Sequence, residues 1–332
     1  MEKGNQYAVQ LDGLRFIAVF MVMIAHWAQW QFTNELIASI PFVHGVILFF
    51  VLSGFLITRI LMQGAEAGGS SGGFLKNFYI RRVLRIFPIY YLLIFTLFIL
   101  NYQNTRDIFF WLATYTINIF QAIRNEYVGD FNHFWSLGVE EQFYVLYPLV
   151  LFILFRIKHF RLVYSLVCLW LMSFLLAFWC SLQISNSPSG INNIPVASFY
   201  NLPTRSFELL TGAIAVFVLP MFHKLNPRHN VELVTKLLGA ILVIISGFYL
   251  PTHVNYPNAY SLIPLLGTFL VLITEEENLA TRILSNRILV TIGLMSFSLY
   301  LIHQPLFAFY RLSIFDSASK IDFLFLILKE NV

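Results

Sequence analysis

The chain of 332 residues is too apolar to be an ordinary soluble domain. Hydrophobic residues make up 58% of it and charged residues only 11%, whereas charged residues are about 25% of a typical soluble domain. The formal net charge of +4 arises from basic residues that lie between apolar runs, a pattern typical of membrane proteins that requires no nucleic-acid partner.

Apolar runs recur along the chain, each near the ~20 residues that a helix needs to cross a bilayer. We therefore expect an all-α polytopic membrane protein with about ten transmembrane helices. The predicted spans are residues 14–32, 42–62, 83–101, 134–156, 160–182, 203–221, 233–251, 258–274 and 288–310. Residues 321–328 look like the start of a tenth span, so the last helix is expected to be incomplete.

The first run, LDGLRFIAVFMVMIAHW, carries three ionisable residues. Ten residues separate Arg15 from His26, which is close to three helical turns, so both side chains fall on one face. Asp12 lies about one turn before Arg15 on nearly the same stripe. A charged group at mid-helix costs roughly 2.5–3.5 kcal/mol, so such a stripe favours a functional role. The interrupted run lacks a small-residue cleavage site and is predicted to be a permanent span rather than a signal peptide.

The distribution of Lys and Arg predicts the orientation. Residues 31–45 contain neither, whereas the connection after the second span carries Lys76, Arg81, Arg82 and Arg85, so the N-terminus is predicted inside. Later basic residues also fall inside if 108–122 does not cross fully. These are Arg156, Lys158, Arg161, Lys224, Arg228, Lys236, Arg282 and Arg287.

We therefore expect residues 102–133 to be an outer-side segment, whether surface-lying or re-entrant. Residues 63–75 are rich in Gly and Ser and are predicted to form a flexible inner loop. Residues 183–202 are rich in Ser, Asn and Pro and are predicted to form an outer loop.

Basic residues gather at the inner start of the third span, in RRVLR. Arg82 and Arg85, three positions apart, are expected to project side by side. Guanidinium groups suit bidentate phosphate binding, but a basic cluster at a span entrance is also a common interfacial anchor. The cluster therefore fits either an anchor or a site for a phosphorylated cytosolic ligand.

The same topology places a second polar set in the outer half, namely His26, Glu140, Glu141, Arg205, Glu208 and His303. His26 is expected about 12 Å from the outer helix end and Glu140 at roughly 9–10 Å depth, so a contact that orients a general base is geometrically possible. Packing or helix-dipole roles are the simpler interpretation for Glu141, Glu208 and His303.

Cysteine and metal chemistry are not indicated. Cys168 and Cys180 share one predicted helix and are separated by roughly 18 Å, too far for a disulfide. The sequence also shows no His, Asp or Glu cluster at ligand spacing, so no metal is expected.

Six sequence blocks together resemble the membrane-bound acyltransferase 3 family, and their occurrence in the family's order over about residues 8–310 is specific. They are LDGLRFIAVFMVMIAHW, with its Arg-x10-His signature, GVILFFVLSGFLITRI, RRVLRIFPIYY, FWSLGVEEQFYVLYP, LPTRSFELLTGAI and SFSLYLIHQPL. The resemblance is closest to the branch that O-acetylates bacterial surface polysaccharides.

The resemblance implies a multi-pass enzyme of the bacterial plasma membrane with about ten spans and a cytoplasmic N-terminus. Such an enzyme takes an acyl group, usually acetyl, from cytosolic acyl-CoA and transfers it to a hydroxyl of an extracytoplasmic glycan. That acceptor is a glycan or lipid-linked glycan such as the O-antigen of lipopolysaccharide, a capsule or an exopolysaccharide. Acetyl-CoA is then the donor substrate, and no bound cofactor is implied.

The resemblance also implies roles for individual residues. His26 matches the family's catalytic histidine and Arg15 its partner, with Asp12 beside them and Glu140 as the matching carboxylate. His26 would either remove the acceptor's hydroxyl proton or carry the acetyl group transiently. Arg82 and Arg85, with the adjacent Arg81, match the element associated with the CoA donor. The acceptor-side or structural positions are Ser53, which forms a small-residue turn with Gly54, and Glu141, Arg205, Glu208 and His303.

Residues 1–332 are thus expected to form a single transmembrane acyltransferase domain without a soluble C-terminal domain. The unfinished last span raises the alternative of a truncated, catalytically impaired family member. A transporter or flippase also places charges at the midplane, but we find neither inverted repeats nor paired Gly/Pro-interrupted spans. A non-catalytic sensor or scaffold with the same fold is the remaining alternative.

Overall fold

A computed structural model of the chain describes residues 9–31, 44–66, 71–124, 128–154, 159–185, 194–225, 229–249, 256–274 and 279–315. Throughout these ranges the regular secondary structure is helical. Seven helical segments are long and apolar enough to cross a membrane, or eight if one bent pair counts as a single span. The protein is therefore an all-α polytopic membrane protein, as the sequence predicts.

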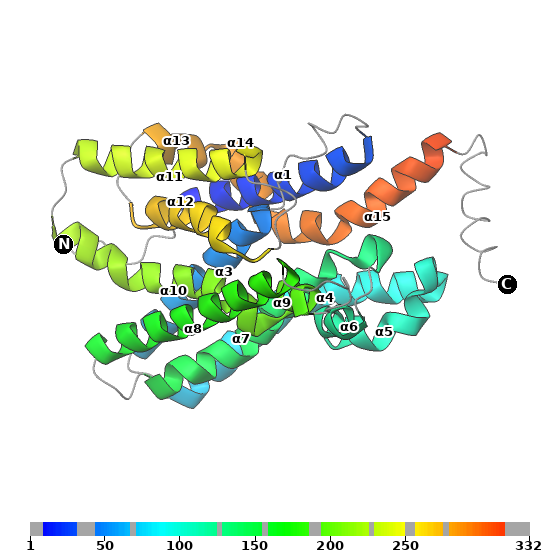
Figure 1. The fold of residues 1–332 in the computed structure, drawn as a ribbon, viewed down its shortest axis with the longest axis horizontal. Helices are drawn as coiled ribbons and strands as arrows, with labels where there is room; N and C mark the ends of the chain where they lie inside the picture. The colour runs from blue at the N-terminus through cyan, green and yellow to red at the C-terminus, as the bar shows by residue number, and fades with distance from the viewer. Residues whose placement is uncertain are drawn as a thin grey trace.

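The long helices form a bundle whose axes run in roughly one direction (Figure 1). They are α1 (Gln10–Gln31), α3 (Gly45–Glu66), α4 (Ser71–Leu100), α7 (Phe134–Leu154), α8 (His159–Ser185), α10 (Leu202–Lys224), α11 (His229–Tyr249) and α15 (Ser296–Phe315). The shorter elements are η2 (Tyr102–Asn104), α5 (Thr105–Ala113), α6 (Ile117–Arg124), η3 (Gly129–Phe131), α9 (Ile194–Tyr200), η4 (Ala259–Ser261), α12 (Leu262–Leu272), α13 (Leu279–Leu284) and α14 (Arg287–Leu294).

Two predicted spans differ from simple transmembrane helices. The span predicted at 258–274 contains α12, whose 11 residues reach only about 16 Å of a ~30 Å hydrocarbon core. The span predicted at 288–310 is bent by 70° between α14 and α15. Met295, which joins them, has φ −88° and ψ 1°, and this non-helical backbone separates the two helices.

The segment predicted to stay on one side of the membrane is broken into short helices. Asn101, Gln103, Asn104 and Tyr115 have φ between 46° and 56°, in the left-handed region that ends right-handed helices. α5 and α6 are consequently only 9 and 8 residues long and lie at one end of the bundle (Figure 1). Neither helix is among the segments long and apolar enough to cross a membrane.

Several predictions fall outside the described residues. These are the incomplete tenth span at 321–328, residues 67–70 of the inner Gly/Ser-rich loop, residues 186–193 of the outer loop, and the basic residues Arg156, Lys158 and Arg228.

Helix α3 lies at the centre of the bundle, because 72% of its most apolar stretch is buried inside the protein. Its backbone approaches that of α10 at two glycines. A Cβ at Gly54 would lie 1.8 Å from the Leu209 carbonyl oxygen, and a Cβ at Gly212 would lie 1.8 Å from that of Val51. Small residues at membrane helix interfaces permit such close approach. This contact fixes the position of Ser53, the neighbour of Gly54.

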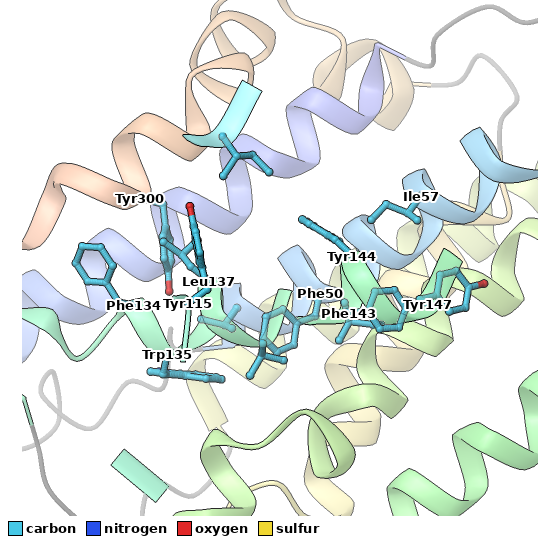
Figure 2. Close-up of a cluster of buried hydrophobic side chains, with 14 of the residues drawn as sticks. Phe50, Ile57, Tyr115, Phe134, Trp135, Leu137, Phe143, Tyr144, Tyr147 and Tyr300 are labelled. Atoms are coloured by element: carbon cyan, nitrogen blue, oxygen red, sulfur yellow. The ribbon is translucent and has the colours of Figure 1, made fainter. Parts of the chain in front are cut away.

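Aromatic side chains from α3, α7 and α15 fill the space beside this interface (Figure 2). Tyr115, Phe134 and Tyr300 lie at one end of the cluster, whereas Tyr144 and Tyr147 lie at the other (Figure 2). By contrast, in α4 and in α8 only 22% of the most apolar stretch of each helix is buried. Those two helices therefore present most of their apolar surface outward, as lipid-facing helices do.

Candidate active site

Six of the predicted site residues line a single cavity between α1, α3, α4, α7 and α15. They are Arg15, Ser53, Arg82, Arg85, Glu140 and Glu141. The cavity has a volume of about 810 Å³, counting the part that opens to solvent. It combines guanidinium and carboxyl groups with aromatic walls that include Phe50 and Tyr300.

The two glutamates of the predicted outer set are not separated from the predicted inner set. Glu140 and Glu141 share the cavity with the arginines of the predicted inner set. The start of α7 is packed within the protein, since Phe131 and Phe134 are each only 1% exposed.

A hydrogen-bond network holds the Glu140 carboxylate. The Ser53 hydroxyl donates to Glu140 Oε1 at 2.9 Å, and the Tyr144 hydroxyl lies 3.2 Å from Oε2 and 3.0 Å from Ser53 Oγ. The Arg82 guanidinium carbon lies 5.0 Å from the centre of the Tyr144 ring, within cation–π range. The network therefore joins the carboxylate to a cavity arginine.

Arg15 enters the cavity from α1 as half of an ion pair. Its Nη1 donates to Asp12 Oδ1 at 2.8 Å, and the Asp12 side chain is 1% exposed. Asp12 itself does not line the cavity. It compensates the charge of Arg15 and fixes its direction, and its position in the first turn is favourable to the helix dipole.

The three basic residues of α4 are not equivalent. Arg82 is half-buried, and both Arg82 and Arg85 line the cavity. Arg81 is exposed and is not part of the lining. The three-residue spacing thus places Arg82 and Arg85 on one side of α4, as predicted, and turns Arg81 away.

His26 contacts another histidine rather than a glutamate. Its Nδ1 lies 2.8 Å from Nε2 of His303, and the two rings are nearly parallel, at an interplanar angle of 11°, with centroids 5.0 Å apart. The His26–Glu140 contact that the sequence left possible is not formed, and Glu140 instead contacts Ser53 and Tyr144. The pair does not line the cavity, but the lining residue Tyr300 lies against it, with its ring centroid 5.5 Å from that of His303.

Arg205 and Glu208 form a buried ion pair beside the cavity. Arg205 Nη2 donates to Glu208 Oε2 at 2.9 Å, and both side chains are at most 2% exposed. The Tyr256 hydroxyl donates to Glu208 Oε1 at 2.6 Å. Burial raises the pKa of this hydroxyl well above its ordinary range, which favours the neutral phenol as donor. The Arg205 guanidinium carbon lies 4.5–5.4 Å from the ring centres of Phe50, Trp135, Phe199 and Tyr256.

Comparisons with known proteins show the family to which the chain belongs. A family model described as an acyltransferase domain matches residues 9–328. The chain belongs to the acyltransferase 3 family. The O-acetyltransferase OatA of Staphylococcus aureus is 31% identical to this acyltransferase 3 protein, over 92% of this chain and 51% of the relative.

The peptidoglycan O-acetyltransferase OatA of Listeria monocytogenes is 28% identical, over 91% of this chain and 50% of the relative. The acyltransferase 3 protein spans about half the length of these curated relatives. No solved structure matches it significantly.

Sequence reasoning missed His133, Ser136 and Tyr300 in this acyltransferase 3 protein. The Tyr300 hydroxyl lies 2.5 Å from Ser136 Oγ and donates to the His133 carbonyl at 3.1 Å. The His133 ring centroid lies 4.9 Å from that of His303. All three residues occur in or beside conspicuous blocks, FNHFWSLGVEEQF and SFSLYLIHQPL, but no spacing rule pairs positions that far apart.

A third imidazole beside His26 and His303 raises the question of a metal. In the part of the chain that the structure describes, no three His, Cys, Asp or Glu residues are arranged to hold a metal ion. The three rings instead make ring and hydrogen-bond contacts with one another and with backbone carbonyls.

Proposed function

We propose that this protein is an O-acyltransferase of the bacterial plasma membrane, with its N-terminus in the cytoplasm. It takes an acyl group, usually acetyl, from cytosolic acetyl-CoA and transfers it to a hydroxyl group of an extracytoplasmic glycan. The observation that carries this proposal is the cavity whose lining brings Arg15, Arg82 and Arg85 together with the Ser53–Glu140–Tyr144 network and with Tyr300, which lies beside the histidine pair.

The arginines of the cavity suit the donor. CoA carries a pyrophosphate and a ribose phosphate, and guanidinium groups bind phosphate oxygens through paired, charge-assisted hydrogen bonds. Arg82 and Arg85 are the proposed phosphate ligands. The excess of Lys and Arg at this end of α4 is also what the positive-inside rule expects of a cytoplasmic side.

The histidine pair suits the transfer step. In one route His26 accepts the proton of the glycan hydroxyl, the oxygen attacks the thioester carbon, and the C–S bond breaks as His26 gives the proton to the departing CoA thiolate. In the other route His26 attacks the thioester carbon and CoA leaves as a thiolate. The glycan hydroxyl then displaces the acyl group from the imidazole, and its proton passes to the thiolate. Both routes conserve the acyl group and return His26 to its starting form.

The acceptor class rests on the relatives. One of them is named as a peptidoglycan O-acetyltransferase, so peptidoglycan joins O-antigen, capsule and exopolysaccharide as a proposed acceptor. Because this chain spans about half the length of those relatives, the acceptor must be tested directly. The test is to measure base-labile acetate and NMR spectra of cell wall and surface glycans from cells with and without the gene. The comparison identifies which glycan loses an acetyl group and at which position.

The test of the enzyme itself is His26→Ala. We expect this variant to insert into the membrane at normal levels and to lose acetyl-CoA-dependent O-acetylation. His223→Ala is the matched control, because His223 is 38% exposed near the end of α10 and contacts Glu232 rather than the cavity. Full glycan acetylation in cells that carry only His26→Ala contradicts the proposed role of His26.

A further inference from the structure

We infer that His303 is a positioning residue that fixes the protonation pattern of His26, so that Nε2 of His26 is the nitrogen that reacts. The inference rests on the proposed function and adds to it the atom at which the chemistry occurs. It follows from two hydrogen bonds and from the rule that a carbonyl oxygen can only accept.

The first hydrogen bond determines where His303 carries its proton. His303 Nδ1 lies 2.6 Å from the carbonyl oxygen of Tyr300. Because that oxygen cannot donate, Nδ1 must carry a hydrogen. In a neutral imidazole the other nitrogen is then an acceptor, so His303 Nε2 presents a lone pair.

The second hydrogen bond transfers this restriction to His26. His303 Nε2 lies 2.8 Å from His26 Nδ1, and two lone pairs cannot face each other at that distance. His26 Nδ1 must therefore carry the hydrogen and donate it. In the neutral ring the lone pair of His26 is then on Nε2, which makes no hydrogen bond with any other residue that the structure describes.

The neutral state of His303 follows from its surroundings. The His303 residue is 1% exposed, and the His26 and His133 rings lie with centroids 5.0 and 4.9 Å away. A buried cation without a carboxylate partner is costly, and among the described residues His303 forms no ion pair with an acid. The neutral imidazole is therefore the form that these surroundings favour for His303.

The backbone of α15 supports the arrangement. Pro305 has no N–H, so the carbonyl oxygen of Leu301, four residues earlier, lacks its usual helical partner. His133 Nε2 lies 3.2 Å from this oxygen and can satisfy it. His133 thus links the start of α7 to α15 directly beside His303.

The chemical consequence is the same in both proposed routes. When Nε2 of His26 accepts the hydroxyl proton, or forms a bond to the acyl carbon, positive charge develops on the ring. The Nδ1–H···Nε2 bond to His303 then becomes a charge-assisted hydrogen bond, which is roughly twice as strong as a neutral one. His303 would accelerate the reaction without contacting either substrate.

Variants of His303 separate an acceptor role from a packing role. In His303→Gln the side-chain oxygen can take the place of Nε2 and accept from His26. In His303→Asn the amide reaches only the place of Nδ1, and His303→Leu removes both functions. We expect kcat to fall about tenfold to a hundredfold for Asn and Leu, as for outer partners of ligand histidines, and to be largely preserved for Gln. The KM for acetyl-CoA should not change, because the pair does not line the cavity.

The outcomes distinguish this inference from the proposed function. Wild-type kcat in His303→Leu, together with an inactive His26→Ala, overturns the inference and leaves the proposed function standing. An active His26→Ala removes the catalytic role itself. Equal losses in all three His303 variants, with normal membrane insertion, indicate a need for the imidazole ring rather than for an acceptor and also overturn the inference.

NMR of the wild-type protein gives a test that does not depend on variants. In detergent-solubilised protein labelled with ¹⁵N-histidine, His26 should carry its ring proton on Nδ1, and a nitrogen–nitrogen coupling should connect that atom to His303 Nε2. The His26→Ala spectrum assigns the signals. A His26 ring protonated at Nε2 in the neutral state contradicts the inference.

Discussion

The Ser53 hydroxyl on α3 donates a hydrogen bond of 2.9 Å to the Glu140 carboxylate on α7. The Tyr144 hydroxyl lies within hydrogen-bond distance of both groups, and the same tyrosine presents its ring to the Arg82 guanidinium. One side chain therefore supports both the carboxylate and a proposed donor-binding arginine. The hydroxyl and ring of Tyr144 can be removed separately.

Tyr144→Phe and Tyr144→Leu should affect different steps. Phe keeps the ring beside Arg82 but loses the hydroxyl, so we expect a lower kcat and an unchanged dissociation constant for acetyl-CoA. Leu also loses the cation–π contact, worth about 0.5–2 kcal/mol, which corresponds to about a twofold to thirtyfold weaker affinity. Isothermal titration with acetyl-CoA and steady-state kinetics measure the two effects. Equal affinity losses in the two variants would contradict a role for the ring.

Replacing both Arg82 and Arg85 by Gln should weaken acetyl-CoA binding strongly. A hydrogen bond to a charged group contributes about 1.5–3 kcal/mol, so loss of either arginine should cost at least about tenfold in affinity. Arg81→Gln is the control, because Arg81 is exposed and does not line the cavity. Binding should be measured at one fixed ionic strength, since salt screens these charges. Unchanged affinity in the double variant leaves only the interfacial-anchor interpretation.

Hydropathy was sufficient to predict the membrane class and most spans, because crossing a bilayer imposes a length and an apolar composition. It could not show that α12 is short or that α14 and α15 are bent by 70°. Those features depend on backbone conformation at a few positions. One of them is Met295, which lies inside a run that hydropathy alone assigns to a single span, residues 288–310.

The site was predictable where its residues are neighbours on one helix. Helical spacing placed Arg15 with Asp12 and Arg82 beside Arg85. Arg81, which the sequence analysis grouped with these two as donor-binding, is exposed and does not line the cavity. Helical spacing could not find contacts such as Ser53–Glu140 or His26–His303, whose partners are 87 and 277 positions apart. Nor could it show that Glu140 shares a cavity with arginines of α1 and α4, because helical spacing carries no information on which helices pack together.

The α3–α10 contact predicts a large cost for Gly54→Ala. The added Cβ would lie 1.8 Å from the carbonyl oxygen of Leu209, so the backbones must separate and Ser53 must shift with α3. Overpacking of this kind typically costs about 1–3 kcal/mol or more. We expect a lower melting temperature in detergent and loss of acetyltransferase activity.

Gly64→Ala is the matched control on the same helix. Its added Cβ would meet the outer ring atoms of the Phe74 side chain, at 1.9 Å, and a side chain can rotate away where a backbone cannot. Gly64→Ala should therefore lower the melting temperature less than Gly54→Ala. The reverse order would show that the α3–α10 approach does not limit stability.

The Arg205–Glu208 pair predicts that a double replacement is milder than either single one. Arg205→Met leaves a buried carboxylate whose remaining partner is Tyr256, and Glu208→Leu leaves a buried guanidinium among four aromatic rings. Breaking a buried pair costs about 3–5 kcal/mol, whereas replacing both partners by apolar residues is often neutral. The two single variants should thus lower the midpoint of SDS-induced unfolding strongly, and the double variant should recover most of that loss.

The activity of the folded double variant then shows whether the pair has a catalytic role in addition to a structural one. If it acetylates glycan normally, the pair only stabilises the bundle; if it is stable but inactive, Arg205 or Glu208 also acts on the acceptor.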